Sequence, residues 1–372
     1  MQRVNIIGSN VISSLGFTSE ENFQGVLNGK SGLRFHSENA MQPLSLIDQF
    51  KFNENCSAHG LADDLSRFEK LCILSIKDAI SQSSIRIESA DCLVILASTK
   101  GNVGMLETNG EPSKSIYLWE SARKIGAYFN AAHRPMVVSH ACVSGVSAQV
   151  MAVRMLNAGH YKNIVVCGAD LISDFVLSGF QSFKALSPQA CKPFDLNRNG
   201  LSLGEGAGSI VFSTDPSEAL FGGVCCLAGA SSNDANHISG PSRTGDGLAN
   251  AIFSALEQSK VHPQFISAHG TATPYNDEME SKAISLVHLQ GVPVNSLKSF
   301  FGHTLGAAGM IETICTLFSM EASMAIGTLG FEKLGVSEPI QVTNQTKDLQ
   351  FDSFLKIASG FGGCNAAVVY SK

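Results

Sequence analysis

Ten short apolar runs, divided into two successive sets of five, constrain the fold of this chain more than any other feature. The first set is VNIIG, DCLVILAS, PMVVSHA, NIVVCGAD and AGSIVFS, and the second is GGVCCLAGA, FISAHG, VPVNSLKS, FLKIASG and NAAVVYS. Helical patterns separate the runs, and continuous apolar runs of this length are typical of buried, largely parallel strands. Because the two sets are similar in length and order, we expect two pseudo-equivalent α/β halves.

A polar, proline-containing segment, STDPSEALFGG, joins the two sets at residues 213–223. We therefore divide the chain into an N-terminal half, residues 1–215, and a C-terminal half, residues 216–372. A chain of 372 residues can bury a substantial core, and its length alone allows either two or three domains or one large α/β unit.

Composition and charge exclude several classes of protein. The sequence has no run of 18 or more apolar residues, and its first residues do not fit a signal peptide, so we expect a cytoplasmic protein without membrane insertion. A net charge of -6 and the lack of a basic block argue against nucleic-acid binding. The ten cysteines form no C-x-x-C pair, so we expect reduced thiols and no metal site.

The stretch VVSHACVSGVSAQVMA places Cys142 between a strand-like run and a helix. Val146 and Val150 have helical spacing and predict a helix from about Val143 to a stop near Gly159. Cys142 then lies at the positive end of this helix, where unpaired N–H groups favour a thiolate. A cysteine in an apolar context is more often a core residue, so its position alone does not make it a nucleophile.

Two segments of the second half supply candidate partners for Cys142. SAHGTATPYNDEME and NSLKSFFGHTLGAAGMIE each follow a strand-like run, at the place where the sites of open α/β sheets gather. Their candidate residues are His269, Thr271, Thr273, Asp277, Lys298, His303 and Glu312. We expect Asp277 at a helix N-cap. Taken singly, each histidine is more often a hydrogen-bonded structural residue.

Five motifs occur along the chain in the order HACVSG, KPFDLNRNGLSLGEGAG, HGTATPYNDEME, SLKSFFGHTLGAAGMIE and SGFGGCN. With them the chain resembles the β-ketoacyl-acyl carrier protein synthases, elongating Cys-His-His condensing enzymes of the thiolase superfamily. The resemblance extends from VNIIGSNVISSLG to GFGGCNAAVVYS. It implies a thiolase-like five-layer αβαβα fold of two duplicated halves, within the α/β class, and it agrees with the two sets of runs.

The resemblance also implies the catalytic residues. Cys142 matches the cysteine that is acylated, and the backbone N–H groups of Cys142 and Phe361 match the oxyanion hole. His269 and His303 match the two active-site histidines. The charged residues of the site are Lys298, which we include among the catalytic residues around the second histidine, with Glu312 and Asp277 in support.

Substrate-binding residues follow from the same comparison of motifs. Thr271 and Thr273 match a pair that hydrogen-bonds the pantetheine arm. Phe180 matches an aromatic residue near the acyl pocket, and Ser359 occupies a position where elongating relatives often have a gating phenylalanine.

The implied activity is an acyltransferase reaction, a decarboxylative Claisen condensation of an enzyme-bound acyl thioester with malonyl-acyl carrier protein, in fatty acid, polyene or polyketide biosynthesis. A thiolate takes the acyl group, and the two histidines stabilise the enolate that forms when malonyl thioester loses carbon dioxide. No cofactor is implied, because phosphopantetheine arrives on the acyl carrier protein. The implied partners are that carrier and a second subunit, in a homodimer or in a heterodimer with a related ketosynthase.

The alternative is a non-catalytic, chain-length-factor-like partner subunit of a ketosynthase heterodimer, which usually lacks the nucleophile. The chain departs from the family between STKGN and HACVSG, where it is shorter than most members, so the pathway and the acyl chain length stay open. ADDLSRFEKLC places Arg67 and Lys70 where relatives have a basic docking cluster for the acidic carrier. We expect Asp195, Arg198 and Cys364 to be structural.

Overall fold

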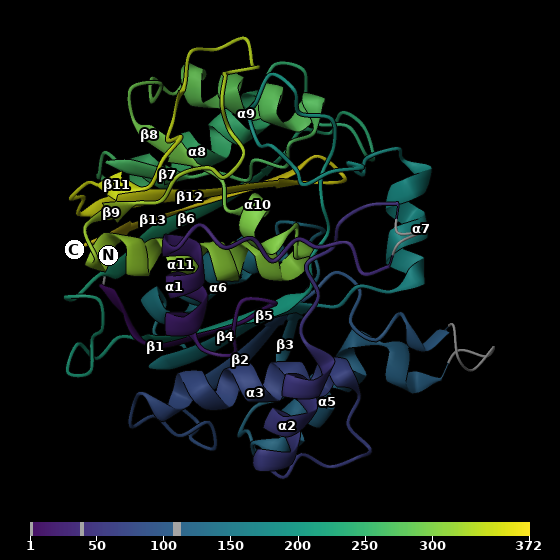
Figure 1. Cartoon of the computed structure of the whole chain (residues 1–372). Coiled ribbons are helices and arrows are strands. Elements are labelled where there is room, and N and C mark those ends of the chain that lie inside the picture. The colour runs from purple at the N-terminus through teal and green to yellow at the C-terminus, as the bar shows by residue number, and fades with distance from the viewer. Residues whose placement is uncertain (1–2, 38–40, 107–112) are drawn as a thin grey trace.

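The computed structural model describes residues 3–37, 41–106 and 113–372, which form two stacked β-sheets with helices between and outside them (Figure 1). The strands of the first sheet are β1 (Val4–Ile12), β2 (Cys92–Ala97), β3 (Met136–Val138), β4 (Asn163–Asp170) and β5 (Gly206–Ser213). Those of the second are β6 (Cys225–Asn233), β7 (Phe265–Ser267), β8 (Pro293–Asn295), β10 (Gln341–Val342), β12 (Ser353–Gly360) and β13 (Cys364–Ser371). A separate short pair consists of β9 (Met324–Ala325) and β11 (Lys347–Asp348).

Strand order is the same in the two halves. The first sheet runs β3-β2-β4-β5-β1, and the second runs β8-β7-β12-β13-β6 with β10 added beyond β8. In both halves the first two ladders are parallel and the last two are antiparallel. This repeated topology confirms the expected duplication.

The sheets are mixed, whereas the sequence analysis expected largely parallel strands. Continuous apolar runs report burial on both faces of a sheet, and here helices cover both faces whatever the strand direction. β1 and β6 also pair over two residues, so the two sheets are joined at one edge. β5 ends at Ser213 and β6 begins at Cys225, and the predicted boundary between residues 215 and 216 lies in this connection.

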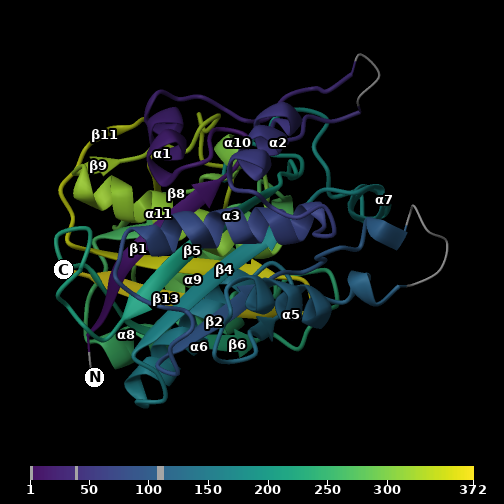
Figure 2. The same cartoon turned by 90° about the horizontal axis from the view of Figure 1, so that it is seen from below.

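Helices form three layers around the two sheets. The helices of the first half are α1 (Ser19–Leu27), α2 (Gln49–Ala58), α3 (Arg67–Ser81), α5 (Leu118–Tyr128), α6 (Ser144–Asn157) and α7 (Asp174–Ser182), with the short 3-10 helix η1 (Lys114–Ile116). Those of the second half are α8 (Asp246–Ser259), α9 (Pro274–Leu286), α10 (Lys298–Phe301) and α11 (Ala308–Glu321), with η2 (Leu305–Ala307). α3 lies across the first sheet, as Figure 2 shows, and α8 and α9 cover the second. α6 and α11 lie between the sheets, which confirms the five-layer αβαβα fold.

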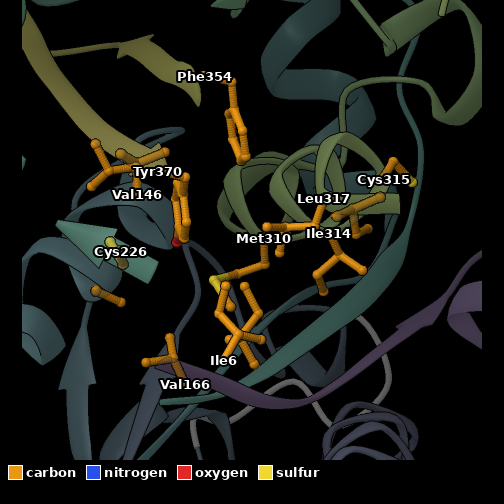
Figure 3. Packing of buried hydrophobic residues seen from close by; sticks show 14 of the residues in the cluster. Ile6, Val146, Val166, Cys226, Met310, Ile314, Cys315, Leu317, Phe354 and Tyr370 are labelled. Atoms are coloured by element: carbon orange, nitrogen blue, oxygen red, sulfur yellow. The ribbon is translucent and has the colours of Figure 1, made fainter. Parts of the chain in front are cut away.

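The central layer is held by apolar side chains from both sheets and both central helices (Figure 3). Val146 of α6 and Met310 of α11 are completely buried, as are Val166 of the first sheet and Phe354 of the second. Full burial of such a side chain stabilises the folded state by about 1.5–3 kcal/mol. The core therefore fixes how the two halves meet.

Two glycines let the central helices touch. A Cβ atom on Gly145 of α6 would lie 2.7 Å from the carbonyl oxygen of Gly306, and one on Gly309 of α11 would lie 2.6 Å from a methyl group of Val146. Because each helix presents its glycine to the other, Gly145 and Gly309 are equivalent positions of the two halves. This close approach brings the start of α6 next to the segment that precedes α11.

Candidate active site

Cys142 lies in a tight turn between β3 and α6. The helix begins at Ser144 and ends at Asn157, before Gly159 with φ +73°, which confirms the predicted helix. Ala141 adopts φ +45°, a conformation that is uncommon for a residue with a side chain. The Ser144 hydroxyl accepts the His140 N–H at 2.8 Å and donates to the Ala141 carbonyl at 2.6 Å. The hydroxyl therefore holds the strained turn that presents Cys142.

The Cys142 thiol is protonated in the free protein, which corrects our expectation of a resting thiolate. Its side chain is buried, and burial raises its pKa to about 11. Lys298 and a hydrogen bond from the Phe361 backbone lower this pKa, while the nearby Asp170 carboxylate raises it. The helix end at Cys142 does not compensate for the lost hydration of a thiolate.

The Phe361 backbone N–H lies at the Cys142 sulfur. The two are hydrogen bonded, and Gly360 makes the approach possible, since a Cβ atom there would lie 3.0 Å from the Cys142 nitrogen. Gly362 and Gly363 follow with φ +82° and +72°, values that favour glycine. The roles of the Phe361 and Cys142 N–H groups in an oxyanion hole stay predictions.

His269 and His303 lie edge to face, with ring centroids 5.0 Å apart and planes at 83°. His303 Nδ1 accepts the Leu305 N–H at 3.2 Å, and His269 Nδ1 lies 3.4 Å from the Lys298 ammonium, which can only donate. In both rings the proton is therefore on Nε2. Burial, followed by the charge of Lys298, lowers both pKa values well below 6.5. Both rings are neutral at pH 7 and carry one Nε2–H donor each.

A buried ion cluster lies behind His269. Lys298 donates to Glu312 Oε1 at 2.5 Å and to the His269 carbonyl at 2.7 Å. It therefore contacts the first histidine, whereas we had expected it around the second. Lys356 of β12 donates to Glu312 Oε2 at 2.6 Å, and both lysine side chains are fully buried. The sequence analysis missed Lys356, although a lysine inside the apolar run FLKIASG was a signal.

Two carboxylates of α9 support the loop that carries His269. Glu280 accepts the backbone N–H groups of His269 at 2.7 Å and Gly270 at 2.6 Å, and burial raises its pKa to about 7. Asp277 accepts the Thr271 N–H at 2.9 Å. Asp277 is not an N-cap, because α9 begins at Pro274 and its N-cap is Thr273. It supports the loop from inside the helix.

A cavity of about 480 Å³ brings the predicted reactive residues together. Cys142, His269 and His303 all line it, whereas Lys298, Glu312 and Asp277 lie outside its lining. The predicted binding residues that line it are Thr271, Thr273, Phe180 and Ser359. Their roles toward pantetheine and the acyl chain stay predictions.

Aromatic side chains form one wall of this cavity. The Phe361 ring lies 5.7 Å from the Phe180 ring and 5.3 Å from the Phe183 ring. The Ser359 hydroxyl donates to the Asn365 side chain at 2.8 Å. The Phe361 ring contributes to the aromatic wall of the cavity, a position that the sequence analysis did not assign to it.

Arg67 is not a free docking residue. Its guanidinium binds both oxygens of buried Glu205, at 3.0 and 2.7 Å, and lies over the Phe52 ring. Arg67 therefore pairs with the buried Glu205 carboxylate. Lys70 lies 3.9 Å from Asp63.

Asp195, Arg198 and Cys364 have structural surroundings, as expected. Asp195 accepts the backbone N–H groups of Glu332 and Lys333, and Arg198 donates to the Gly335 carbonyl. Cys364 is a buried free cysteine outside the cavity lining.

Among residues 3–37, 41–106 and 113–372, no cluster of three or more His, Cys, Asp or Glu side chains could hold a metal ion. In the same part of the chain, each helix is too short or too polar to span a bilayer.

Family models match most of the chain. The beta-ketoacyl synthase N-terminal domain matches residues 1–217, and the beta-ketoacyl synthase C-terminal domain matches residues 223–332. The chain belongs to the β-ketoacyl synthase family. The resemblance carried by its motifs is thereby confirmed, and with it the expectation of an acyltransferase-type condensing enzyme.

Relatives in this family align over the full length of the chain. The "3-oxoacyl-[acyl-carrier-protein] synthase 2" of Coxiella burnetii (strain RSA 493 / Nine Mile phase I) is 26% identical, with 100% of this chain and 99% of that protein covered. The protein of the same name from Synechocystis sp. (strain ATCC 27184 / PCC 6803 / Kazusa) is 27% identical, with 100% and 98% covered.

Solved ketosynthases have the same fold. "The ishigamide ketosynthase/chain length factor" aligns with a TM-score of 0.89 and 25% identity, covering 100% of this chain and 99% of that chain. A type II PKS acyl-carrier protein in complex with its ketosynthase gives a TM-score of 0.87 and 22% identity, covering 100% and 99%.

Proposed function

We propose that the protein catalyses a decarboxylative Claisen condensation between an acyl group held on Cys142 and malonyl-acyl carrier protein, in fatty acid, polyene or polyketide biosynthesis. The observation that carries this proposal is the convergence of one cysteine and two neutral histidines on a single cavity, with a backbone N–H at the cysteine sulfur. This set provides a nucleophile and separate donors for two oxyanions.

The first step acylates Cys142. Its sulfur attacks the carbonyl carbon of an acyl thioester, and the Phe361 N–H stabilises the oxyanion that develops. The bond from the acyl carbon to the pantetheine sulfur then breaks, and the Cys142 proton passes to the departing pantetheine thiol. Because the thiol is protonated at rest, this transfer belongs to the acylation step.

The second step forms the carbon–carbon bond. The bond to the malonyl carboxylate breaks, carbon dioxide leaves, and the Nε2–H groups of His269 and His303 stabilise the enolate oxygen. Neutral rings suit this role, because each keeps one donor without a mobile proton on Nδ1. The enolate carbon attacks the acyl carbon, the bond to Cys142 breaks, and the sulfur takes up one proton.

The carrier arm enters through the open side of the same cavity. The hydroxyls of Thr271 and Thr273 lie 2.9 Å apart on its wall, suitably placed for the amides of phosphopantetheine. Phosphopantetheine on the carrier is the prosthetic group that this chemistry needs. A related ketosynthase subunit is the proposed second partner, because a relative of the same fold is a ketosynthase/chain length factor.

Lys184 is the proposed docking residue for the acidic carrier, in place of Arg67. It is exposed and lines the mouth of the cavity. Lys184→Glu should weaken carrier binding and reduce its salt dependence, because it reverses one charge of the contact. Lys51→Glu on α2, in the outer helix layer, is the matched control and should leave binding unchanged. Equal binding by the two variants would contradict this docking site.

Acyl transfer to Cys142 is the direct test of the proposed function. The protein is incubated with acyl carrier proteins of several chain lengths, then analysed by intact mass and peptide mapping. One acyl group should be found on Cys142, and addition of malonyl-acyl carrier protein should release it as a β-ketoacyl product. Cys142→Ala should lose the adduct and still decarboxylate malonyl thioester. No adduct at any chain length, with a partner subunit present, would support the non-catalytic alternative, which the intact site does not favour.

A further inference from the structure

Lys356 is a buried charge next to the site that the proposed mechanism leaves unexplained. It lies in β12, its side chain is fully buried, and it does not line the cavity. A buried lysine is costly unless it is paired and hydrogen bonded. Its position next to the histidine loop therefore needs a reason beyond packing.

The contacts of Lys356 show that it is an ammonium. Nζ donates to Glu312 Oε2 at 2.6 Å, to the Ala268 carbonyl at 2.9 Å and to the Ser267 carbonyl at 3.2 Å. Three acceptors use three N–H donors, and a neutral amine has only two. Lys298 likewise has three acceptors, which are His269 Nδ1, the His269 carbonyl and Glu312 Oε1.

The charges of the cluster do not cancel. Two ammonium groups share the single carboxylate of Glu312, so these three side chains carry a net charge of about +1. Glu280, whose pKa burial raises to about 7, is the other carboxyl group that faces this cluster and accepts the His269 N–H. The two lysines also bind consecutive carbonyls, Lys356 that of Ala268 and Lys298 that of His269. They thus fix both the position and the electrostatic surroundings of this histidine.

We propose that Lys356 is a positioning residue for decarboxylation, which holds the Lys298–Glu312 pair and His269 in place and adds positive charge behind both histidine rings. This inference rests on the proposed function. A positive charge behind the donors also favours negative charge on the enolate oxygen they bind. Lys356 contributes to the lowered pKa of both His269 and His303, behind the effects of burial and Lys298.

Other titratable groups around the cluster define what a pH profile would report. Lys356 faces Glu312 on α11, Lys298 on α10 and Glu280 on α9, and these same groups shift its own pKa. His269 and His303 complete the set. Because Glu280 has a pKa of about 7, its titration must be separated from that of the histidines.

The test compares three variants of Lys356 in malonyl-thioester decarboxylation across pH. Lys356→Met removes the charge and the donors but keeps an unbranched side chain, and it leaves Glu312 paired with Lys298. Lys356→Gln removes the charge and keeps a donor, so it serves if the methionine variant does not fold. Lys356→Arg keeps the charge and should retain the wild-type profile.

In both charge-removing variants we expect kcat to fall about tenfold with KM unchanged, and the acid limb of the profile to move up by about one pH unit. Acylation of Cys142 should be unaltered. NMR titration of the two histidine rings gives the same shift without relying on turnover. The Glu280→Gln variant, which keeps Lys356, shows which part of the pH profile of decarboxylation is due to titration of the Glu280 carboxylate.

Folded variants with unchanged kcat, acid limb and histidine titration would overturn the proposal and leave Lys356 a packing residue. A change in KM alone would also overturn it, since Lys356 does not line the cavity. If the wild-type protein does not decarboxylate malonyl thioester, the proposed function fails instead, and the histidine titration still decides the electrostatic role.

Discussion

The two halves share a topology, and their chemistry differs at equivalent positions facing the central layer. β4 pairs with β5 along eight residues, as β12 does with β13, and the fourth residue is Val166 in β4 and Lys356 in β12. Val166 belongs to the apolar core of the central layer, and a Cβ atom on Gly168, two residues further on, would lie 2.7 Å from the side chain of Met310 in α11. At the position that matches Val166, Lys356 instead extends to Glu312 of the same helix.

The central helices differ in the same way. Counting three residues from the equivalent glycines, Gly145 and Gly309, reaches Ala148 in α6 and Glu312 in α11. Small side chains in the first half let the helices pack closely, and this packing positions the Cys142 turn. In the second half, the charged side chains of Lys356 and Glu312 occupy the corresponding space and hold His269 in place. One architecture thus supplies a nucleophile from one half and oriented donors from the other.

The largest expected effect comes from removing the carboxylate of the second half. Glu312→Gln leaves two buried ammonium groups without a counter-charge, so the free energy of unfolding should fall by about 3–5 kcal/mol. Urea denaturation measures it, and Glu321→Gln at the exposed end of the same helix is the control. A loss below about 1 kcal/mol, the value of an exposed pair, would mean that the cluster is not buried as described.

Removing one enolate donor should have the next largest effect. His269→Ala or His303→Ala should each lower malonyl decarboxylation by about 10²–10³-fold, because one preorganised donor is lost. The double variant should lose little more, since both donors serve one oxygen. Acylation of Cys142, measured by intact mass, is the internal control. Equal losses of acylation and decarboxylation would show that the halves do not divide the chemistry.

Acidification should reveal the buried neutral histidines. Their folded pKa values lie well below 6.5, so the unfolded chain binds more protons than the folded one between those values and 6.5. The contribution of the neutral histidines to the free energy of unfolding is fully present above about pH 6.5. Below this pH it decreases by up to about 1.4 kcal/mol per histidine for each pH unit. Urea denaturation of wild type and His303→Asn from pH 7.5 to 5 measures this slope. A slope unchanged by the substitution would contradict the assignment.

The smallest effect tests the close packing of the first half. Gly168→Ala adds one methyl group against Met310, and overpacking of this kind costs about 1–3 kcal/mol. Gly179→Ala in α7, where an added Cβ meets no neighbour within 4 Å, is the control. Thermal denaturation compares the two. Equal stability would show that α11 can shift away from β4, and that the glycine is not required there.

The reactive residues were assigned by the resemblance of five motifs to a known family, and the strand pattern explains how two of them come together. Cys142 follows β3 and His269 follows β7, and strand ends that meet at one face bring such residues together. The pattern could not show pairing between distant positions. Lys356 meets Glu312, 44 residues away, and Arg67 meets Glu205, 138 residues away. It also could not show that burial outweighs the helix end at Cys142, since protonation depends on the packed surroundings.

The high pKa of Cys142 bears on how the protein survives between turnovers. Peroxide oxidises the thiolate form of cysteine, first to sulfenic acid and then irreversibly to sulfinic and sulfonic acids. With a pKa of about 11, only about one molecule in 10⁴ carries the thiolate at pH 7. An idle molecule therefore resists oxidants that would inactivate a permanently ionised nucleophile.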